Sequence, residues 1–332
     1  MPNLILEDPL AIDESAEVKR ISDWLRVVLR DKLNRRGFVV ALSGGVDSSV
    51  CAALAVAALG SNKVLGLMLP EQDSSPESLA LAHELANFLK IPYLVEDITA
   101  SLTAVGCYRW RDEAIQAVFP DYTTEWRSKI VISGSLKGQI NHFRLVVQPP
   151  GKEVQEAPLK LKEYLQIVAA TNYKQRTRKI IEYFHADRLN YAVLGTPNRL
   201  EYDQGFFVKN GDGAADVKPI AHLYKTQVYK LARYFGLPVQ ICQAQPTTDT
   251  YSLSQGQDEF YFALPYAQMD LALWAYNQGM PESQLAQLLN IEEQKAHIIY
   301  KDIEAKRRTT QYQHLPALII DPIFNNSNII VA

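Results

Sequence analysis

The stretch Phe38–Val50, FVVALSGGVDSSV, places a glycine-rich loop between an apolar run and an alanine-rich run. Residues 38–42 are typical of a buried strand, and residues 47–59 predict a tightly packed helix. Two glycines at this junction let the backbone turn sharply and approach a ligand without a Cβ clash. Because the helix directs its free N–H groups and the positive end of its dipole at the loop, the stretch predicts a phosphate-binding loop.

The elements around this loop alternate between strand and helix patterns. Further strands are predicted at 64–69, 93–98 and 191–196, and further helices at 13–33, 76–89 and 159–187. Ser75 is the expected N-cap of the helix over 76–89, with Pro76 in its first turn. Strand and helix alternating within so few residues indicate right-handed crossovers and a parallel sheet, and therefore an α/β protein.

Two regions lie outside this alternation. Residues from about 100 to 158 contain an aromatic, basic cluster at 108–111 and a strand-like piece at 141–148. They are interpreted as an insertion, for which structural packing or an oligomer contact is the favoured role. The region from about 250 to 332 is mostly helical, with helices predicted at 281–289 and 292–308. We expect one domain over 1–332 that includes both regions.

Composition narrows the class of protein. The formal net charge is −3, which gives no electrostatic case for a nucleic-acid partner. The three cysteines, Cys51, Cys107 and Cys242, are odd in number and form no CxxC pair, so neither a disulfide framework nor a cysteine zinc site is expected. No signal-peptide pattern and no apolar run of bilayer length is evident, so we expect a cytoplasmic protein without a membrane partner.

Asp47 distinguishes this loop from the better-known phosphate loops. Neither a GxxxxGK[ST] string nor a GxGxxG after a strand occurs; Gly211–Gly213 comes closest, but Asp216 takes the place of the third glycine. A carboxylate beside phosphates repels them unless a cation lies between, so Asp47 suggests a magnesium ion. The alternative is that Asp47 only caps the helix, as acidic residues often do. The loop by itself favours neither interpretation.

The loop resembles the pyrophosphate-binding loop SGGVDSS of the ATP pyrophosphatases, and the rest of the chain resembles the NAD synthetases among them. Residues 195–238, GTPNRLEYDQGFFVKNGDGAADVKPIAHLYKTQVYKLARYFGLP, match their long signature. TNYKQRTR at 171–178 is similar to the helix upstream of it, QPTTDTYSLSQGQDE at 245–259 to a substrate loop, and EAKRRTT to a C-terminal basic segment. The resemblance implies a doubly wound parallel sheet of the adenine-nucleotide α-hydrolase type.

The resemblance also implies roles for individual residues. Those implied to bind ATP are Ser43, Gly44, Gly45, Asp47, Ser48, Ser49, Thr196, Lys225 and Thr247. Asp47 and Glu201 would bind Mg²⁺ through oxygen, and the ion and Lys225 would neutralise the charge on the departing pyrophosphate. Asp47 and Lys225 are therefore the expected catalytic residues. Deamido-NAD would be bound by Arg176, Lys209, Asp212 and Lys306.

The implied reaction converts deamido-NAD to NAD in two steps. The nicotinate carboxylate would attack ATP to form an adenylate with release of pyrophosphate, and ammonia would then displace AMP. Glutamine-dependent members carry an N-terminal amidase domain, for which residues 1–42 leave no room. We therefore expect a homodimer without a glutaminase domain, which uses free ammonia or ammonia from a separate donor.

Four features depart from the family pattern: the insertion, Pro197, Val208 and Ala305. The insertion and Ala305 are expected near the nicotinate half of the substrate, whereas the adenylating half is intact. Two alternatives therefore stand beside NAD synthesis. One is an ammonia-dependent adenylating ligase for a different carboxylate, and the other is a non-catalytic nucleotide-binding relative.

Overall fold

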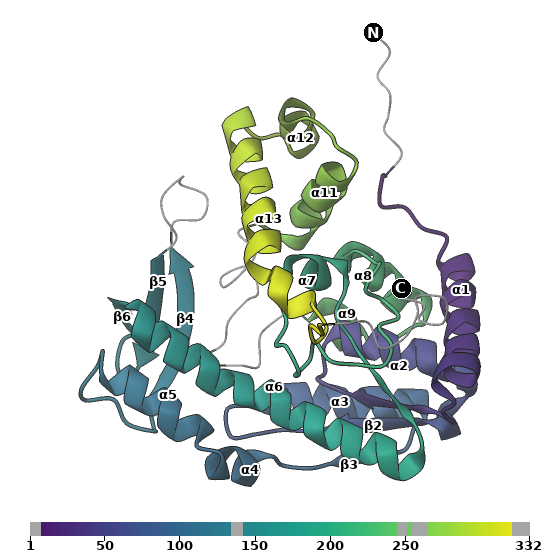
Figure 1. The fold of residues 1–332 in the computed structure, drawn as a ribbon, viewed down its shortest axis with the longest axis horizontal. Helices are drawn as coiled ribbons and strands as arrows, with labels where there is room; N and C mark the ends of the chain where they lie inside the picture. Colours follow the sequence, from purple (N-terminus) through teal and green to yellow (C-terminus); the bar gives the residue numbers. More distant parts are fainter. Residues whose placement is uncertain (1–7, 134–141, 245–250, 254–263, 321–332) are drawn as a thin grey trace.

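A four-stranded parallel sheet forms the centre of the molecule (Figure 1). The computed structural model describes residues 8–133, 142–244, 251–253 and 264–320. The strands lie in the order β3-β2-β1-β7. Their bounds are Tyr93–Val95, Val64–Met68, Phe38–Ala41 and Ala192–Leu194. Parallel pairing sets Phe38 opposite both Val64 and Ala192, so β1 lies between its two neighbours and its carboxyl end opens where the order of strands reverses.

Helices cover both faces of this sheet, as the alternation of side chains along β1 requires. Phe38 and Val40 face one layer of helices and Val39 faces the other. The first layer consists of α1 (Glu14–Val27), α2 (Val46–Leu59), α3 (Pro76–Leu89), α8 (Lys225–Tyr234) and α9 (Val239–Gln243). The second consists of α4 (Thr99–Ala104), α5 (Cys107–Gln116) and α6 (Leu161–Leu189). The expected doubly wound sheet is thereby confirmed.

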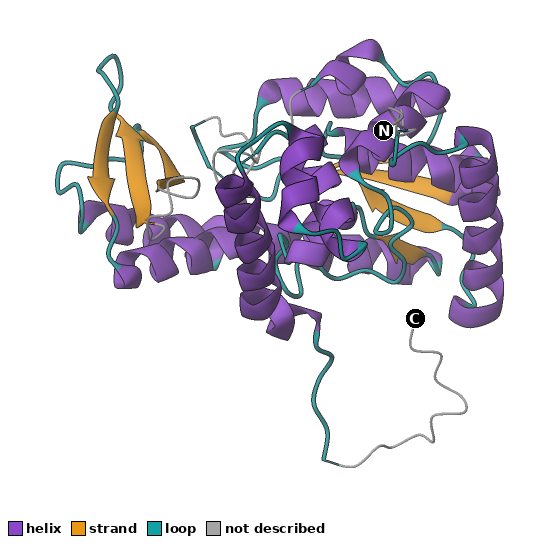
Figure 2. Cartoon of the chain, turned by 90° about the horizontal axis from the view of Figure 1, so that it is seen from above, coloured by secondary structure: helices purple, strands orange, loops and turns teal. Residues whose placement is uncertain are grey.

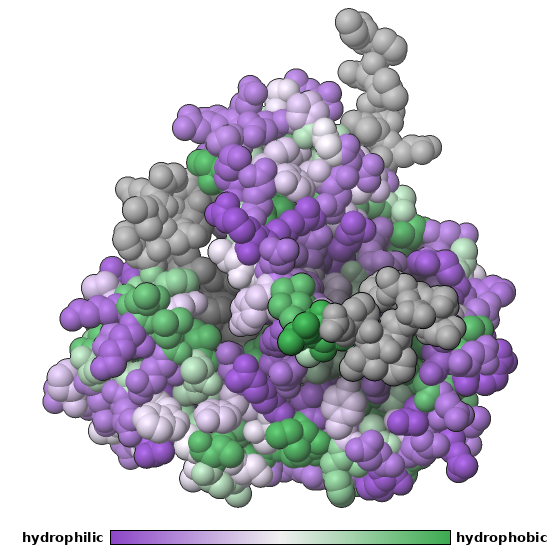
Figure 3. Space-filling model, in the orientation of Figure 1, coloured by the Kyte–Doolittle hydropathy of each residue, from purple (hydrophilic) through white to green (hydrophobic). Residues whose placement is uncertain are grey.

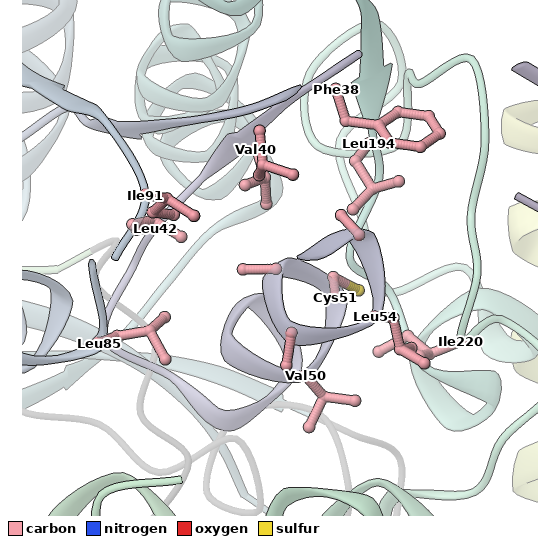
Figure 4. Packing of buried hydrophobic residues seen from close by; sticks show 14 of the residues in the cluster. Phe38, Val40, Leu42, Val50, Cys51, Leu54, Leu85, Ile91, Leu194 and Ile220 are labelled. Carbon is pink, nitrogen blue, oxygen red and sulfur yellow. The ribbon is translucent and has the colours of Figure 1, made fainter. Parts of the chain in front are cut away.

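The packing around α2 explains its alanine-rich sequence. Val50, Cys51 and Leu54 of this helix are fully buried in the cluster that contains Phe38 and Leu194 of the sheet. Cys51 lies on the side of α2 nearer the sheet and Val50 on the opposite side (Figure 4). Small side chains on the other sides of α2 let α1 and α8 approach it closely. The helix that starts at the glycine loop is therefore held from several directions, which fixes the position of its N-terminus.

The predicted insertion contains a small sheet of its own. Strands β4 (Arg127–Ser133), β5 (His142–Gln148) and β6 (Gln155–Pro158) pair antiparallel in that order. Figure 2 shows this sheet at one end of the molecule, apart from the parallel sheet. Its buried face packs on α5 and the start of α6 around Ile115, Leu145 and Ile167.

The C-terminal region is helical, as expected. It contains α11 (Tyr266–Asn277), α12 (Glu282–Leu289) and α13 (Glu293–His314). These helices share a core with Leu200 of the short helix α7 (Arg199–Gln204) and with Tyr224, which precedes α8. None of the helices among the residues described is both long and apolar enough to cross a membrane.

Most predicted element boundaries lie within about two residues of the observed ones, and three elements differ further or change in kind. The first helix becomes π-helical over Val28–Leu33, preceding Asn34 in the left-handed conformation. Strand β3 ends at Val95, although the Glu96 and Ile98 N–H groups still bond to the Met68 and Pro70 carbonyls before α4 begins. Helix α13 continues past Arg308 to His314, since Thr310 packs on Gly205 and prolongs the buried face.

Candidate active site

The glycine loop joins β1 to α2, and its geometry requires glycine at Gly44. This residue has φ of +80°, and a Cβ there would lie 2.4 Å from the Ser78 carbonyl oxygen. The start of α3 therefore packs directly on the loop. Ser43 and Ser48 hydroxyls lie 3.1 Å apart, and Ser48 donates to the Gly45 carbonyl at 3.0 Å. The Ser43 and Gly45 N–H groups bond to the Ser48 and Ser43 hydroxyls, so the loop is held in shape by its own side chains.

A cavity of about 1450 Å³ opens above this loop. Its wall contains most of the residues predicted to bind ATP: Ser43, Gly44, Gly45, Asp47, Ser48, Thr196 and Lys225. Glu201, predicted to bind the metal, lines it as well. The volume exceeds the roughly 300–1,000 Å³ that is usual for a single small ligand, so the cavity is large enough for ATP together with part of a second substrate.

Among the described residues, one of those predicted to bind ATP, Ser49, is not on this wall. Ser49 is fully buried beneath the loop, where its hydroxyl donates to the Gly45 carbonyl at 2.8 Å. It supports the loop rather than facing the cavity. Thr247 falls outside the residues that the structure describes.

Asp47 lies at the centre of a polar cluster at the N-terminus of α2. One of its carboxylate oxygens contacts the Lys225 ammonium, and the other accepts a hydrogen bond of 3.1 Å from the Asn198 amide. Asn198 also caps α7 by accepting the Glu201 N–H at 3.2 Å, while the Glu201 carboxylate accepts the Asn198 N–H at 3.1 Å. Three separate segments therefore bring two carboxylates and one cation together.

The electrostatics of this cluster are those of groups withdrawn from water. Burial, with the Asp47 charge adding to it, raises the pKa of Glu201 to about 7. Burial by itself would lower the pKa of Lys225, but the Asp47 and Glu201 charges outweigh it and raise that pKa above its ordinary value. Lys225 is therefore a permanent cation, and the two carboxylates share an environment that favours added positive charge.

Asn198 is a site residue that we did not predict. It is almost fully buried and contacts both carboxylates of the cluster. The spacing N-x-x-E in GTPNRLE carried the signal, because an asparagine three residues before a glutamate is a capping-box pattern. That pattern predicts a helix start, but only the fold brings the asparagine to Asp47.

The four predicted substrate residues are not gathered at one place. Asp212 lines the cavity and accepts the Val208 N–H at 2.8 Å, and its burial raises the pKa of its carboxyl. Arg176 and Lys209 are neighbours outside the cavity wall, joined by a bond of 3.2 Å from the Arg176 guanidinium to the Lys209 carbonyl. The Lys209 ammonium donates to the Tyr312 and Leu315 carbonyls near the end of α13.

Lys306, the fourth of these residues, also lies off the wall. It forms an ion pair of 2.6 Å with Asp302, one turn earlier on α13. Burial lowers the pKa of Lys306, and the Asp302 charge opposes that effect.

Asp73 and Arg111, two members of a buried ion network, line another part of the cavity. Lys174 contacts Glu71 at 2.9 Å and Asp73 at 2.7 Å, and Arg111 contacts Asp73 at 2.6 Å. Lys174, Glu71 and Arg111 are each buried, and they connect α6, the loop after β2 and the insertion. Their charges are far apart along the chain, so the sequence did not predict the network, although Arg111 belongs to the insertion for which structural packing was the favoured role.

A glycine loop at the carboxyl edge of a doubly wound sheet, with an acidic pair and a buried lysine beside it, defines an α/β nucleotide-binding protein. The model of the NAD synthase family matches residues 17–116 and 139–313. The chain therefore belongs to the NAD synthase family. Residues 117–138, within the insertion, lie between the two matched segments.

Individual relatives agree with the family. A Rhizobium rhizogenes protein named NH(3)-dependent NAD(+) synthetase is 53% identical over 318 residues, 96% of this chain and 96% of that protein. A Mesorhizobium japonicum protein of the same name is 55% identical over 311 residues, 93% of this chain and 98% of that protein.

Solved structures share the fold. An NMN synthetase from Francisella tularensis has a TM-score of 0.63 at 23% identity, covering 95% of this chain and all of that one. The NH3-dependent NAD synthetase from Campylobacter jejuni has a TM-score of 0.62 at 19% identity, covering 93% of this chain and all of that one.

Proposed function

We propose that this protein is an ATP-dependent ligase that converts deamido-NAD to NAD with ammonia, releasing AMP and pyrophosphate. Its identity with NH(3)-dependent NAD(+) synthetases along nearly the whole chain supports the reaction. The observation of the structure that carries the proposal is the contact of Lys225 with Asp47 directly beneath the glycine loop. This arrangement puts a fixed cation and an acidic group where ATP phosphates would lie.

In the first step, a carboxylate oxygen of deamido-NAD attacks the α-phosphorus of ATP. An oxygen–phosphorus bond forms, the bond from the α-phosphorus to the bridging oxygen breaks, and pyrophosphate leaves with the electron pair. The loop residues Ser43–Ser48 would hold the phosphates through backbone N–H groups and hydroxyls. Lys225 would stabilise the charge that develops on pyrophosphate, which is worth more in a buried site than in water.

In the second step, ammonia attacks the activated carbonyl carbon and AMP leaves. A carbon–nitrogen bond forms, the bond from carbon to the AMP oxygen breaks, and the proton lost from nitrogen passes to solvent or to the departing phosphate. The activated carboxyl carries a good leaving group, so the step does not require a side-chain nucleophile. The role of the protein in this reaction is to position two substrates and to neutralise charge.

The donor chemistry of the site fits Mg²⁺. No group of three or more histidine, cysteine, aspartate or glutamate side chains that could hold a metal ion occurs within the described part of the chain. Mg²⁺ commonly uses only one or two carboxylates and takes its other ligands from water and substrate phosphates. Asp47 and Glu201 would hold the ion. When bound, the ion would neutralise the charge of the phosphates and orient them. Lys225 would then exchange Asp47 for a phosphate oxygen.

Arg176, Lys209, Asp212 and Lys306 stay proposals for deamido-NAD binding. The neighbouring cations Arg176 and Lys209 support them, because a dinucleotide carries two phosphates that such cations pair well. The Lys209 contacts to the end of α13 imply that substrate would replace carbonyl oxygens there.

A homodimer is supported by an apolar surface on α6 and the edge strand β3. The exposed side chains are Leu161, Leu165, Ile180 and Phe184 of α6 and Tyr93, Leu94 and Val95 of β3. Green patches lie on the lower part of the face in Figure 3, where α6 runs. Apolar surface of this kind marks an interface. Light scattering should report a dimer that Phe184→Glu dissociates and Val27→Glu, on α1, does not.

The reaction is tested by incubating the protein with ATP, Mg²⁺, ammonium chloride and deamido-NAD. We expect NAD, AMP and pyrophosphate in equal amounts. Nicotinate mononucleotide is the competing carboxylate in a parallel reaction. If it alone turned over, the protein would be a ligase for a different carboxylate, and ATP binding without any turnover would indicate a non-catalytic relative.

The metal assignment is tested with Asp47→Asn and Glu201→Gln. Both should weaken Mn²⁺ binding in the presence of ATP, measured by electron paramagnetic resonance, and lower the rate at least 100-fold, as loss of charge stabilisation does elsewhere. Asp31→Asn, on an exposed carboxylate paired with Arg30, is the matched control and should change neither. Wild-type rates in Asp47→Asn would show that the assignment is wrong.

A cytoplasmic location and a separate ammonia donor stay predictions. Cell fractionation and the rate at limiting free ammonia would check them.

A further inference from the structure

The lysine proposed to act on pyrophosphate is the first residue of its helix. α8 begins at Lys225, so the backbone N–H groups of its first turn have no partner within the helix. Donors of this kind must find acceptors elsewhere when they are buried. The acceptors that bind these N–H groups fix the position of the first turn of the helix. They thereby also fix the position of the Lys225 side chain.

A buried carboxylate from the C-terminal region supplies two of these acceptors. Asp270 of α11 accepts the Thr226 N–H at 2.7 Å with one oxygen and the Lys225 N–H at 3.3 Å with the other. Asp270 is completely buried, with 0% of its surface exposed to solvent. The preceding N–H, that of Tyr224, is satisfied separately by the Gln227 side chain at 2.9 Å.

The position of Asp270 in the fold makes it a rigid support. α11 packs with Leu200 and Tyr224, the residues next in sequence to Glu201 and Lys225. Arg307 of α13 contacts Asp203 of α7 with two bonds of 2.6 Å. The C-terminal helices therefore hold both α7 and α8, which carry Glu201 and Lys225.

A buried carboxylate is a costly way to cap a helix, since an apolar residue would avoid the loss of hydration. An aspartate of fixed rotamer offers what an apolar residue cannot, namely two acceptors that bind consecutive N–H groups. Consecutive N–H groups bound by one carboxylate fix both the position and the rotation of the first turn. The Lys225 side chain is fully buried and is then held in the one rotamer that points at Asp47.

We propose that Asp270 is a positioning residue for Lys225: its carboxylate binds the first turn of α8 so that the Lys225 ammonium is held at the phosphate end of the cavity. The inference rests on the proposed function, because it gives Lys225 its catalytic purpose. Asp270 touches neither substrate nor the reacting atoms, so it acts only through the lysine.

The test compares Asp270→Asn and Asp270→Ala with Gln227→Ala. The asparagine variant has the same size and keeps one acceptor oxygen, so it preserves the packing of α11. Gln227→Ala removes another cap of the same helix without touching the bonds to Asp270, and it is the matched control for a general loss of stability. The wild type and the three variants are compared by urea denaturation, by kcat and KM, and by acetylation of lysines read by mass spectrometry.

We expect Asp270→Asn to lower kcat about tenfold, the size expected from losing one charge-assisted bond, with KM for ATP and for deamido-NAD within about twofold. Lys225 should be acetylated several times faster than in wild type, relative to the buried Lys174 as internal reference. Asp270→Ala should show the same changes, and larger ones. Gln227→Ala should lower the denaturation midpoint while leaving kcat and Lys225 acetylation near wild type.

Wild-type kcat and wild-type Lys225 acetylation in folded Asp270→Asn would overturn the proposal. Equal losses in Gln227→Ala would overturn it as well, since Asp270 would then act only through stability. If wild-type protein formed no NAD, the proposed function would fail, and the acetylation comparison would still decide whether Asp270 positions Lys225.

Discussion

Asn198 offers the sharpest test of the cluster, because one side chain serves two roles that different substitutions separate. Its oxygen caps α7 and its amide donates to Asp47. Asn198→Ser keeps a capping hydroxyl but loses the donor to Asp47. Asn198→Ala loses both, and Asn198→Asp keeps the cap but puts a third carboxylate beside Asp47 and Glu201.

The magnitudes follow from these contacts. Loss of a hydrogen bond to a carboxylate costs about 1.5–3 kcal/mol, which is the expected loss for Asn198→Ser. Asn198→Ala adds the loss of an N-cap, about 1 kcal/mol. In Asn198→Asp the lost bond is joined by repulsion, about 4 kcal/mol for unit charges 4 Å apart at an effective dielectric constant of 20. At pH 8 without metal, Asn198→Asp should be the least stable of the three variants.

The assay is the free energy of unfolding from urea denaturation at one protein concentration, with and without Mg²⁺ and ATP. A divalent cation offsets like charges, so Asn198→Asp should gain more stability from Mg²⁺ and ATP than Asn198→Ala does. The reasoning is refuted if Asn198→Ser is as stable as wild type, or if Asn198→Asp is more stable than Asn198→Ala at pH 8 without metal.

Three further predictions concern the loop, the buried carboxylate and the thiols. Gly44→Ala should cost several kcal/mol and abolish ATP binding measured by calorimetry, whereas Gly60→Ala, at φ of +84° but with open space around it, should cost only about 1–2 kcal/mol of backbone strain. Burial raises the pKa of Asp270 to about 6 from its ordinary 3.8, so its contribution to stability is present below pH 3.8 and is lost as pH rises through 6. The wild-type unfolding free energy minus that of Asp270→Asn should therefore fall by about 3 kcal/mol over this range in urea denaturation at each pH, at roughly 1.4 kcal/mol per pH unit; a flat difference would contradict the assignment. Iodoacetamide should modify the half-buried Cys242 first in native protein, because burial raises the pKa of Cys107 to about 11 and shields it; peptide mapping that found Cys107 equally modified would contradict this.

Much of the fold was predictable because its signals are local. The apolar run before Ser43 and the glycines after it mark a strand, a loop and a helix from neighbouring residues only. The capping residue Ser75 was visible for the same reason. The end of β3 was not predictable from the apolar pattern, because the apolar residue Ile98 lies beyond Val95, where the chain turns into α4.

The residues of the candidate site also fall into two groups: those that local motifs predicted and those that depend on distant partners. Asp47, Glu201 and Lys225 were found through motifs, and the fold places all three on one cavity wall. Asn198 and Asp270 were not found, since each acts through a partner far away in the chain. Sequence pattern shows a helix start, but it does not show which distant acceptor satisfies the donors there.

The sequence by itself determined the α/β class, the phosphate loop at Ser43–Ser49 and the resemblance to the NAD synthetases, because each depends on residue types in a fixed local order. Only the tertiary structure decided that Lys225 neutralises Asp47, that Asn198 holds both carboxylates and that Asp270 supports the start of α8. The physical reason is that burial and charge pairing depend on distances between segments, which the folded chain sets.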